Sequence, residues 1–188
     1  MGGEEKRRQL ADGDRAPDFE FVTRDAQRLR SDELLRRGPV LLTFYRGAWC
    51  MCCQSDLREL NRAMPEIRHA GATVLGVFHD LGPEGNDRVV SEYELDFPLV
   101  DDADGRVAEA FGVRRSLGEQ ALEDSELGDL PLALREGGPW IVPMQARFLI
   151  VGDGTIARSD VVFDYNQRTN ADDLLPLLQR LSGSQLGR

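Results

Sequence analysis

The chain has 188 residues, of which 41% are hydrophobic and 30% are charged, and its formal net charge is −10 at pH 7. A chain of this length is typical of one globular domain with a sizeable buried core. The negative charge argues against nucleic acid or an anionic membrane surface as a partner. No apolar run approaches the roughly 18 residues that would indicate a membrane-spanning helix.

The first residues are polar and charged, with no apolar stretch of the kind found in a signal peptide. We therefore predict a flexible N-terminal tail over residues 1–9 and a single domain over residues 10–182. Because no export signal is visible, we expect a cytoplasmic location.

The N-terminal part of the domain predicts an edge strand, a short helix and a buried strand. Residues 19–22 alternate between apolar and charged side chains, as an edge strand does. Ser31 is a favourable N-cap for a short helix that ends at Gly38. The nearly continuous apolar run at 40–44 is typical of a strand buried on both faces.

A long helix is predicted over residues 50–69, with a bend or break at Pro65. Its apolar residues recur at helical spacing, which predicts one buried face. These residues are Leu57, Leu60, Met64 and Ile67.

The middle of the chain alternates between strands and helices. A second buried strand at 73–78 is followed by a loop at 79–86 and a helix at 87–94, and then by an extended segment at 97–100 and a helix at 106–111. We interpret residues 114–140 as one broken helix and a loop.

The last elements are a β-hairpin and a helix. Strands at 146–151 and 155–163 flank a tight turn containing Gly152 and Gly154, and an amphipathic helix is predicted over 171–181, although it contains Pro176. Strands joined through helices run parallel, whereas a hairpin is antiparallel. The order therefore predicts an α/β fold with a central mixed sheet and helices on both faces.

All three cysteines lie within residues 50–53, between the first buried strand and the long helix. Cys50 falls at the start of that helix, where free backbone N–H groups and the helix dipole stabilise a thiolate. At such a position the pKa of a cysteine falls from about 8.5 to roughly 3.5–7.5. Cys53 lies one helical turn later, so the two sulfur atoms can meet. This pair predicts redox chemistry in a reducing compartment.

A metal site is the main alternative for the cysteine cluster. Three thiolates can bind zinc or copper, but structural zinc requires four ligands, and neither His69 nor His79 is placed by sequence to supply the fourth. We therefore expect no metal and no cofactor. Cys52 is rotated by about 100° from Cys53 on the helix, so packing is its expected role. The alternatives are a regulatory thiol and a strained link to Cys53.

Three residues around the cysteines have two interpretations each. Trp49 either covers the thiolate or simply packs. Arg46 either stabilises the thiolate by its charge or is solvated at the loop edge. His79 follows the second buried strand and is either a proton-transfer residue or a packed loop histidine.

The Cys-x-x-Cys segment at the first strand-to-helix turn resembles the thioredoxin fold. Several segments are, in addition, similar to the peroxiredoxin-like branch of the alkyl hydroperoxide reductase/thiol-specific antioxidant (AhpC/TSA) family. They are Gly13 to Phe19, Phe44 to Cys50, Phe97 to Leu99 with Asp102 and Asp104, Phe148 to Ile156, and Asp164-Tyr165 with Arg168. The resemblance covers about residues 10–181 and is weakest over 114–139, which it identifies as an insertion before the C-terminal hairpin.

The resemblance implies a thiol-dependent oxidoreductase that reduces peroxides or disulfides. It implies that Cys50 attacks the oxidant and that Cys53 resolves the product. The residues expected to support them are Tyr45, Arg46, Trp49, Cys52 and Arg147. The expected reductant is a thioredoxin-like dithiol protein or glutathione, and a homodimer is left open.

The chain departs from the family pattern at the positions that orient a peroxide. Gly47 stands where peroxiredoxins have Thr or Ser, and Gln145 stands where they have Arg, with Arg147 two residues further on. Met51 replaces a proline, and either Gln145 or Pro143 occupies the place of a cis-proline. These departures favour disulfides over peroxides. The alternatives are thus a thiol–disulfide oxidoreductase with little peroxidase activity, or a metal-binding module.

Overall fold

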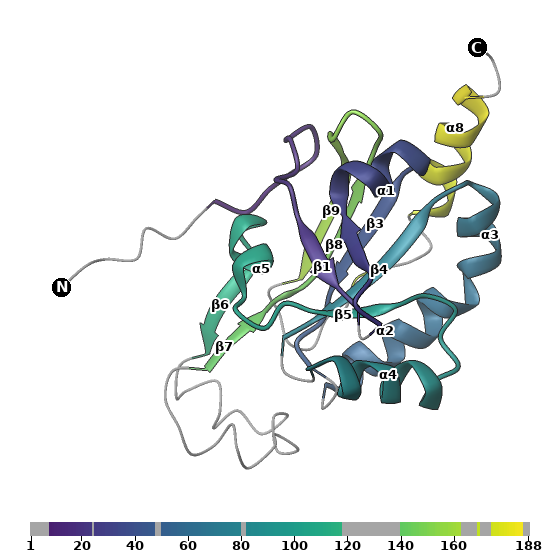
Figure 1. The fold of residues 1–188 in the computed structure, drawn as a ribbon. Coiled ribbons are helices and arrows are strands. Elements are labelled where there is room, and N and C mark those ends of the chain that lie inside the picture. The colour runs from purple at the N-terminus through teal and green to yellow at the C-terminus, as the bar shows by residue number, and fades with distance from the viewer. Residues whose placement is uncertain are drawn as a thin grey trace.

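The computed structural model describes residues 8–23, 25–47, 50–79, 82–117, 140–162, 169 and 174–185. At its centre is a mixed five-stranded sheet with the strand order β5-β4-β3-β8-β9 (Figure 1). These strands are Val40–Phe44 (β3), Thr73–Phe78 (β4), Leu99–Asp101 (β5), Gln145–Ile150 (β8) and Ile156–Val162 (β9). β3, β4 and β5 are parallel, whereas β8 is antiparallel to β3 and β9 is antiparallel to β8. The predicted mixed sheet is confirmed.

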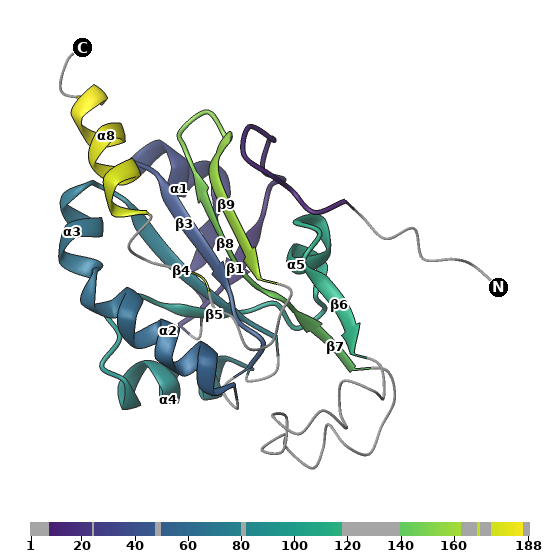
Figure 2. The same ribbon diagram turned by 180° about the vertical axis from the view of Figure 1, so that it is seen from behind.

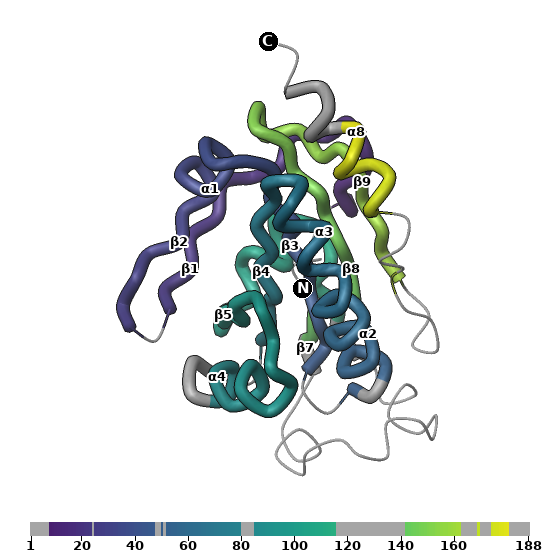
Figure 3. Tube along the Cα trace, turned by 90° about the vertical axis from the view of Figure 1, so that its right-hand side faces the viewer, coloured from purple at the N-terminus to yellow at the C-terminus, as the bar shows by residue number. Residues whose placement is uncertain are grey.

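Helices cover both faces of the sheet. The helices within the described residues are Ser31–Arg37 (α1), Met51–Arg62 (α2), Met64–His69 (α3), Gly82–Glu92 (α4), Arg106–Ala110 (α5) and Leu175–Gln185 (α8). Leu41 and Tyr45 pack with side chains of α2, α3, α4 and α8, whereas Leu42 and Phe44 pack with side chains of α1 and α5. Figure 3 shows α1 on one side of the sheet and α2, α3 and α8 on the other. None of the described helices is long and apolar enough to cross a membrane.

In the part of the chain that the structure describes, two small antiparallel sheets flank the central one. One pairs Glu20–Val22 (β1) with Arg28–Arg30 (β2), and the other pairs Arg114–Leu117 (β6) with Trp140–Pro143 (β7). In Figures 1 and 2 the β6–β7 ribbon extends past one end of the central sheet, next to α5.

The apolar patterns in the sequence correspond to buried elements. Every residue of β3 and of β8 is buried, as a strand in the middle of a covered sheet must be. The predicted helix over 50–69 is divided into α2 and α3 at Ala63, and Pro65 lies in the first turn of α3, where the missing N–H costs least. The four apolar residues predicted to line its buried face are each at most 3% exposed.

Ser31 is not the N-cap of α1, contrary to the prediction. It is the first helical residue, Arg30 occupies the cap, and no side chain caps the helix. The Ser31 hydroxyl instead accepts a hydrogen bond from the Phe19 backbone N–H at 3.1 Å. A contact with a distant segment has therefore replaced the expected local one.

One strand in the first half of the chain was missed, and one helix start was predicted wrongly. β2 was missed because a three-residue strand with two arginines has little apolar pattern. The helix predicted at 87–94 begins at Gly82, because a proline in the second position of a helix does not interrupt it.

The prediction of a broken helix from residue 114 is wrong for its first four residues. Arg114–Leu117 is a strand, and its partner β7 begins 23 residues after it ends. Pairing with a distant segment overrides the weak local preference of this sequence. The rest of the predicted broken helix, residues 118–139, lies outside the described residues.

The C-terminal predictions are confirmed with shifted ends. β8 and β9 form the expected hairpin, and the turn between them is closed by a hydrogen bond from the Gly154 N–H to the Val151 carbonyl. α8 runs to Gln185, and the predicted start of this helix at Ala171 lies outside the described residues.

Candidate active site

The cysteine pair lies where β3 meets α2. β3 leads directly into Tyr45, Arg46 and Gly47, and α2 begins at Met51 with Cys50 as its N-cap. The backbone N–H of Cys53 donates to the Cys50 sulfur at 3.3 Å, so the thiol itself caps the helix. The expected position of Cys50 at a helix start is confirmed.

The two sulfur atoms are in direct contact. The Cys53 thiol donates to the Cys50 sulfur at 2.7 Å, and both cysteines are free thiols and buried. A spacing of three residues at the first turn of a helix places both side chains on the same face. The pair is therefore arranged so that either sulfur can attack a group bound to the other.

The environment separates the pKa values of the two thiols. The hydrogen bond from Cys53 lowers the pKa of Cys50 to about 7, against the opposing effect of burial, with further stabilisation from the charge of Arg46 and from two backbone N–H groups. Burial raises the pKa of Cys53 well above its usual range, and the hydrogen bond to Cys50 and the Cys50 charge raise it further. Near neutral pH, Cys50 is thus the thiol that ionises more readily, and Cys53 holds its proton.

Arg46 is buried, with only 2% of its surface exposed. Of the two interpretations offered by the sequence, the solvated one is wrong. Its charge is among the causes that lower the pKa of Cys50. A guanidinium close to a thiolate in a poorly solvated site stabilises the charged form.

Arg147 lies in a second buried polar group, on the face of β8 that is covered by α2. Its guanidinium pairs with Asp56 of α2 at 2.5 Å, and Asp56 also accepts a hydrogen bond from the Thr169 hydroxyl at 3.0 Å. Gln145 donates to Thr169 at 3.5 Å. We call these four residues the Asp56 cluster. Burial is the largest single influence on Arg147 and lowers its pKa, but the interactions with Asp56 and Tyr45 together outweigh burial and the pKa of Arg147 is raised.

Tyr45 links the two buried groups in space. Its ring belongs to the same core as Cys50 and Cys53, while the charges of Asp56 and Arg147 act on its hydroxyl. Burial, and then the charge of Asp56, raise its pKa well above the usual range, so Tyr45 remains a neutral phenol.

The remaining residues singled out in the sequence lie outside the two buried polar groups or outside the described residues. Cys52 is half-buried at the edge of the core, as expected for a packing residue. The His79 ring donates through Nδ1 to the Asp102 carbonyl at 2.8 Å, which favours the packed loop histidine. No described peptide bond is cis, and Pro143 ends β7. Trp49 lies outside the described residues, as do Asp164, Tyr165 and Arg168.

Asp56 was not predicted to belong to the site, although the sequence carries a signal for it. It lies three residues after Cys53 and four before Leu60, both of which are on the buried face of α2. A carboxylate at such a position requires a buried partner. Which residue provides it follows only from the pairing of β3 with β8. Among the described residues, no three side chains of His, Cys, Asp or Glu are arranged to hold a metal ion.

The sequence profile of the AhpC/TSA family matches residues 13–159. The chain belongs to this family. The peroxiredoxin Bcp of Escherichia coli is 34% identical over 104 residues, which are 55% of this chain and 65% of Bcp. The thiol–disulfide oxidoreductase ResA of Bacillus thuringiensis is 24% identical over 108 residues. That match covers 57% of this chain and 61% of ResA, so the chain spans about three fifths of this relative.

The fold is that of the thioredoxin-like peroxiredoxins. The crystal structure of the peroxidoxin BcpB from Mycobacterium tuberculosis superposes with a TM-score of 0.72 at 24% identity, covering 92% of this chain and 98% of that one. At this level of identity the superposition shows a shared fold, and the roles of individual residues rest on the site geometry.

Proposed function

We propose that this chain is a thiol-dependent oxidoreductase of the peroxiredoxin type, in which Cys50 attacks the oxidant and Cys53 resolves the product. The observation that carries the proposal is the 2.7 Å contact between two free thiols whose pKa values are shifted in opposite directions. Membership of the AhpC/TSA family supports the same chemistry.

With a peroxide, the Cys50 thiolate attacks one oxygen and breaks the O–O bond. Cys50 becomes a sulfenic acid, and the leaving oxygen takes a proton to give an alcohol or water. The Cys53 thiol then attacks the sulfenic sulfur, forms the Cys50–Cys53 disulfide and releases water. An external dithiol, such as a thioredoxin-like protein, or two molecules of glutathione then return two electrons and two protons, which reduces the Cys50–Cys53 disulfide.

With a disulfide, the Cys50 thiolate displaces one thiol and forms a mixed disulfide. Cys53 displaces the second thiol, and the same Cys50–Cys53 disulfide results. Both routes need a reduced pair at the start, which suits the reducing cytoplasm expected from the sequence.

A thiol–disulfide oxidoreductase with little peroxidase activity is the second candidate. Two observations favour it: Gly47 has no side-chain donor for a peroxide, and the guanidinium of Arg147 is paired with Asp56. A preorganised donor is typically worth about 10²–10³ in rate. A disulfide substrate needs only an accessible thiolate of low pKa.

The test is to mix reduced protein with hydrogen peroxide, and separately with a small disulfide, in a stopped-flow instrument, and then to count the remaining thiols. We expect two thiols lost per chain with either oxidant, and a peroxide rate constant below about 10⁷ M⁻¹s⁻¹. Cys53→Ser should be oxidised once and then stall as a trappable sulfenate or mixed disulfide. Cys52→Ser is the matched control and should behave as the wild type. Wild-type turnover by Cys50→Ser would refute the proposal.

A further inference from the structure

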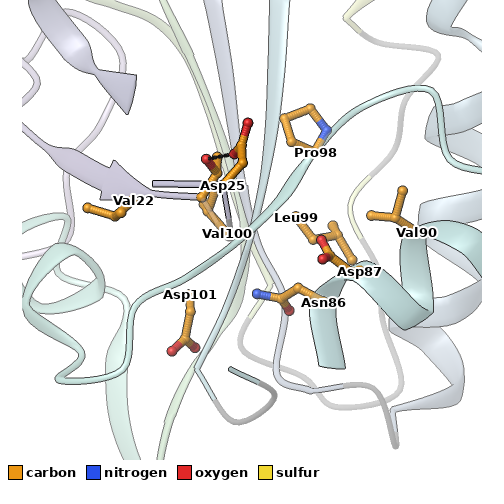
Figure 4. A pocket seen from close by; sticks show the side chains of 10 residues that line it. Val22, Asp25, Asn86, Asp87, Val90, Pro98, Leu99, Val100 and Asp101 are labelled. Carbon is orange, nitrogen blue, oxygen red and sulfur yellow. Dashed lines mark hydrogen bonds between the residues drawn. The ribbon is translucent and has the colours of Figure 1, made fainter. Parts of the chain in front are cut away.

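A cavity of about 510 Å³ lies between the β1–β2 hairpin, α4 and β5 (Figure 4). Its size is within the range of small-molecule sites. Its lining residues are Val22, Thr23, Asp25, Asn86, Asp87, Val90, Pro98, Leu99, Val100 and Asp101. No cysteine is among them, so the thiol chemistry does not account for this cavity.

Asn86 is the residue in this cavity that most needs a partner. It is 1% exposed, and neither its Oδ1 nor its Nδ2 has a hydrogen-bond partner in the described structure. Figure 4 shows its amide extending from α4 into the space beside β5, with the nitrogen on the side of Asp101. A buried amide with both atoms unpaired is costly unless a bound molecule supplies one donor and one acceptor.

The charged residues among the described lining of the cavity have one sign. They are Asp25, Asp87 and Asp101, and no Lys, Arg or His is among the lining residues that the structure describes. The Thr23 hydroxyl donates to Asp25 and lowers the pKa of that carboxyl, so Asp25 stays ionised. A cationic group is the charge that this lining complements.

The remainder of the lining is mostly apolar. Val90 and Leu99 come from α4 and β5, and Val22 of β1 is 51% exposed. A molecule with an aliphatic stem covers these side chains when it binds.

We propose that this cavity binds a small organic cation that has an aliphatic stem and a carboxamide-like edge, with the edge paired to the Asn86 amide and the cation among the aspartates. The site is separate from the cysteine pair, and its occupation requires no thiol chemistry.

A set of three matched probes tests the proposal on the full-length protein. The probe 4-guanidinobutanamide carries the cation, the stem and the amide; 4-ureidobutanamide lacks the charge, and 4-guanidinobutanoate replaces the amide by a carboxylate. We expect the first to bind at least about tenfold more tightly than either of the others. Binding would be measured by titration followed in ¹⁵N–¹H NMR spectra, where the side-chain amide signals of Asn86 should shift.

Variants then separate this site from adventitious binding. Asp87→Asn and Asn86→Leu should each weaken binding of 4-guanidinobutanamide several-fold, whereas Asp18→Asn, which removes an exposed carboxylate outside the cavity, should not. If Asn86→Leu does not fold, Asp87→Asn carries the comparison. Three outcomes would overturn the proposal: no binding at millimolar concentration, equal binding of the guanidino and ureido amides, or equal weakening by Asp87→Asn and Asp18→Asn.

Discussion

Two polar groups are buried in the layer between the central sheet and α2, and they hold their charge differently. At the cysteine pair, the charge on Cys50 is stabilised by hydrogen-bond donors and by Arg46, and Cys53 keeps its proton. In the Asp56 cluster, opposite charges on Asp56 and Arg147 are paired directly. In the first arrangement the Cys50 sulfur remains able to attack an oxidant. In the second, the charges of Asp56 and Arg147 neutralise each other. We therefore expect substitutions in the cysteine pair to abolish the redox reaction, and substitutions in the Asp56 cluster to reduce the stability of the folded protein.

The largest effect should come from Cys50→Ser. Removing the nucleophile should lower turnover with peroxide and with disulfide by at least about 10³-fold, since covalent catalysis has no substitute at this position. The unfolding free energy near pH 7 should change by less than about 1 kcal/mol, because the replacement is similar in size. Steady-state kinetics and urea unfolding measure the two quantities. A large loss of stability with retained turnover would reverse the contrast between the two groups.

The Asp56 cluster should show the opposite behaviour. Asp56→Ala leaves the buried guanidinium of Arg147 without its partner, which should cost about 3–5 kcal/mol in unfolding free energy. The double variant Asp56→Leu/Arg147→Met removes both charges and should recover most of that loss. Urea denaturation of the single and double variants gives the comparison. An unchanged unfolding free energy for Asp56→Ala would show that the pair is not buried as described.

These two groups also show what could be predicted from the sequence. The mixed character of the central sheet, the two buried strands at 40–44 and 73–78 and the cysteine pair followed from apolar runs, element order and residue spacing, because those signals are local. Arg147 was expected among the supporting residues, but its partner Asp56 is 91 residues away and is brought to it only by the packing of α2 on β8. Ser31 and β6 were misjudged for the same reason, since each is determined by a contact with a distant segment.

Within the cysteine pair, Cys53 should have the larger influence on Cys50. Its thiol hydrogen bond is the largest cause of the lowered pKa. Cys53→Ala should therefore raise the pKa of Cys50 from about 7 toward the 8.5 of a free cysteine. Cys53→Ser retains a hydroxyl donor and should raise it less. The thiolate absorbance near 240 nm, followed against pH, reports the value. Equal pKa values in the wild type and Cys53→Ala would remove the argument for this hydrogen bond.

The same shift predicts how stability depends on pH. Because the folded protein holds the pKa of Cys50 below its unfolded value, ionisation of Cys50 favours the folded state. The stability of the wild type relative to Cys50→Ser should thus be constant below about pH 7 and should increase as the pH rises toward 8.5, by up to about 2 kcal/mol. Cys52→Ser should follow the wild type throughout. Urea denaturation of the three proteins at several pH values measures this relative stability. A relative stability that falls as the pH rises would contradict the lowered pKa of Cys50.

The smallest effect should come from Arg46, whose charge ranks below the Cys53 hydrogen bond among the causes that lower the pKa of Cys50. Arg46→Met keeps much of the side-chain volume and removes the charge, so the pKa of Cys50 should rise by less than it does in Cys53→Ala. Arg46→Lys keeps the charge and should restore most of the wild-type value, which a purely structural role of Arg46 would not produce.

The peroxide rate adds a second measurement. If Arg46 also stabilises the developing charge on the leaving oxygen, Arg46→Met should slow the reaction with peroxide more than the reaction with a disulfide after both rates are corrected for the thiolate fraction. Equal slowing with both oxidants would show that Arg46 acts only by stabilising the Cys50 thiolate. No change in the pKa of Cys50 would exclude that role as well.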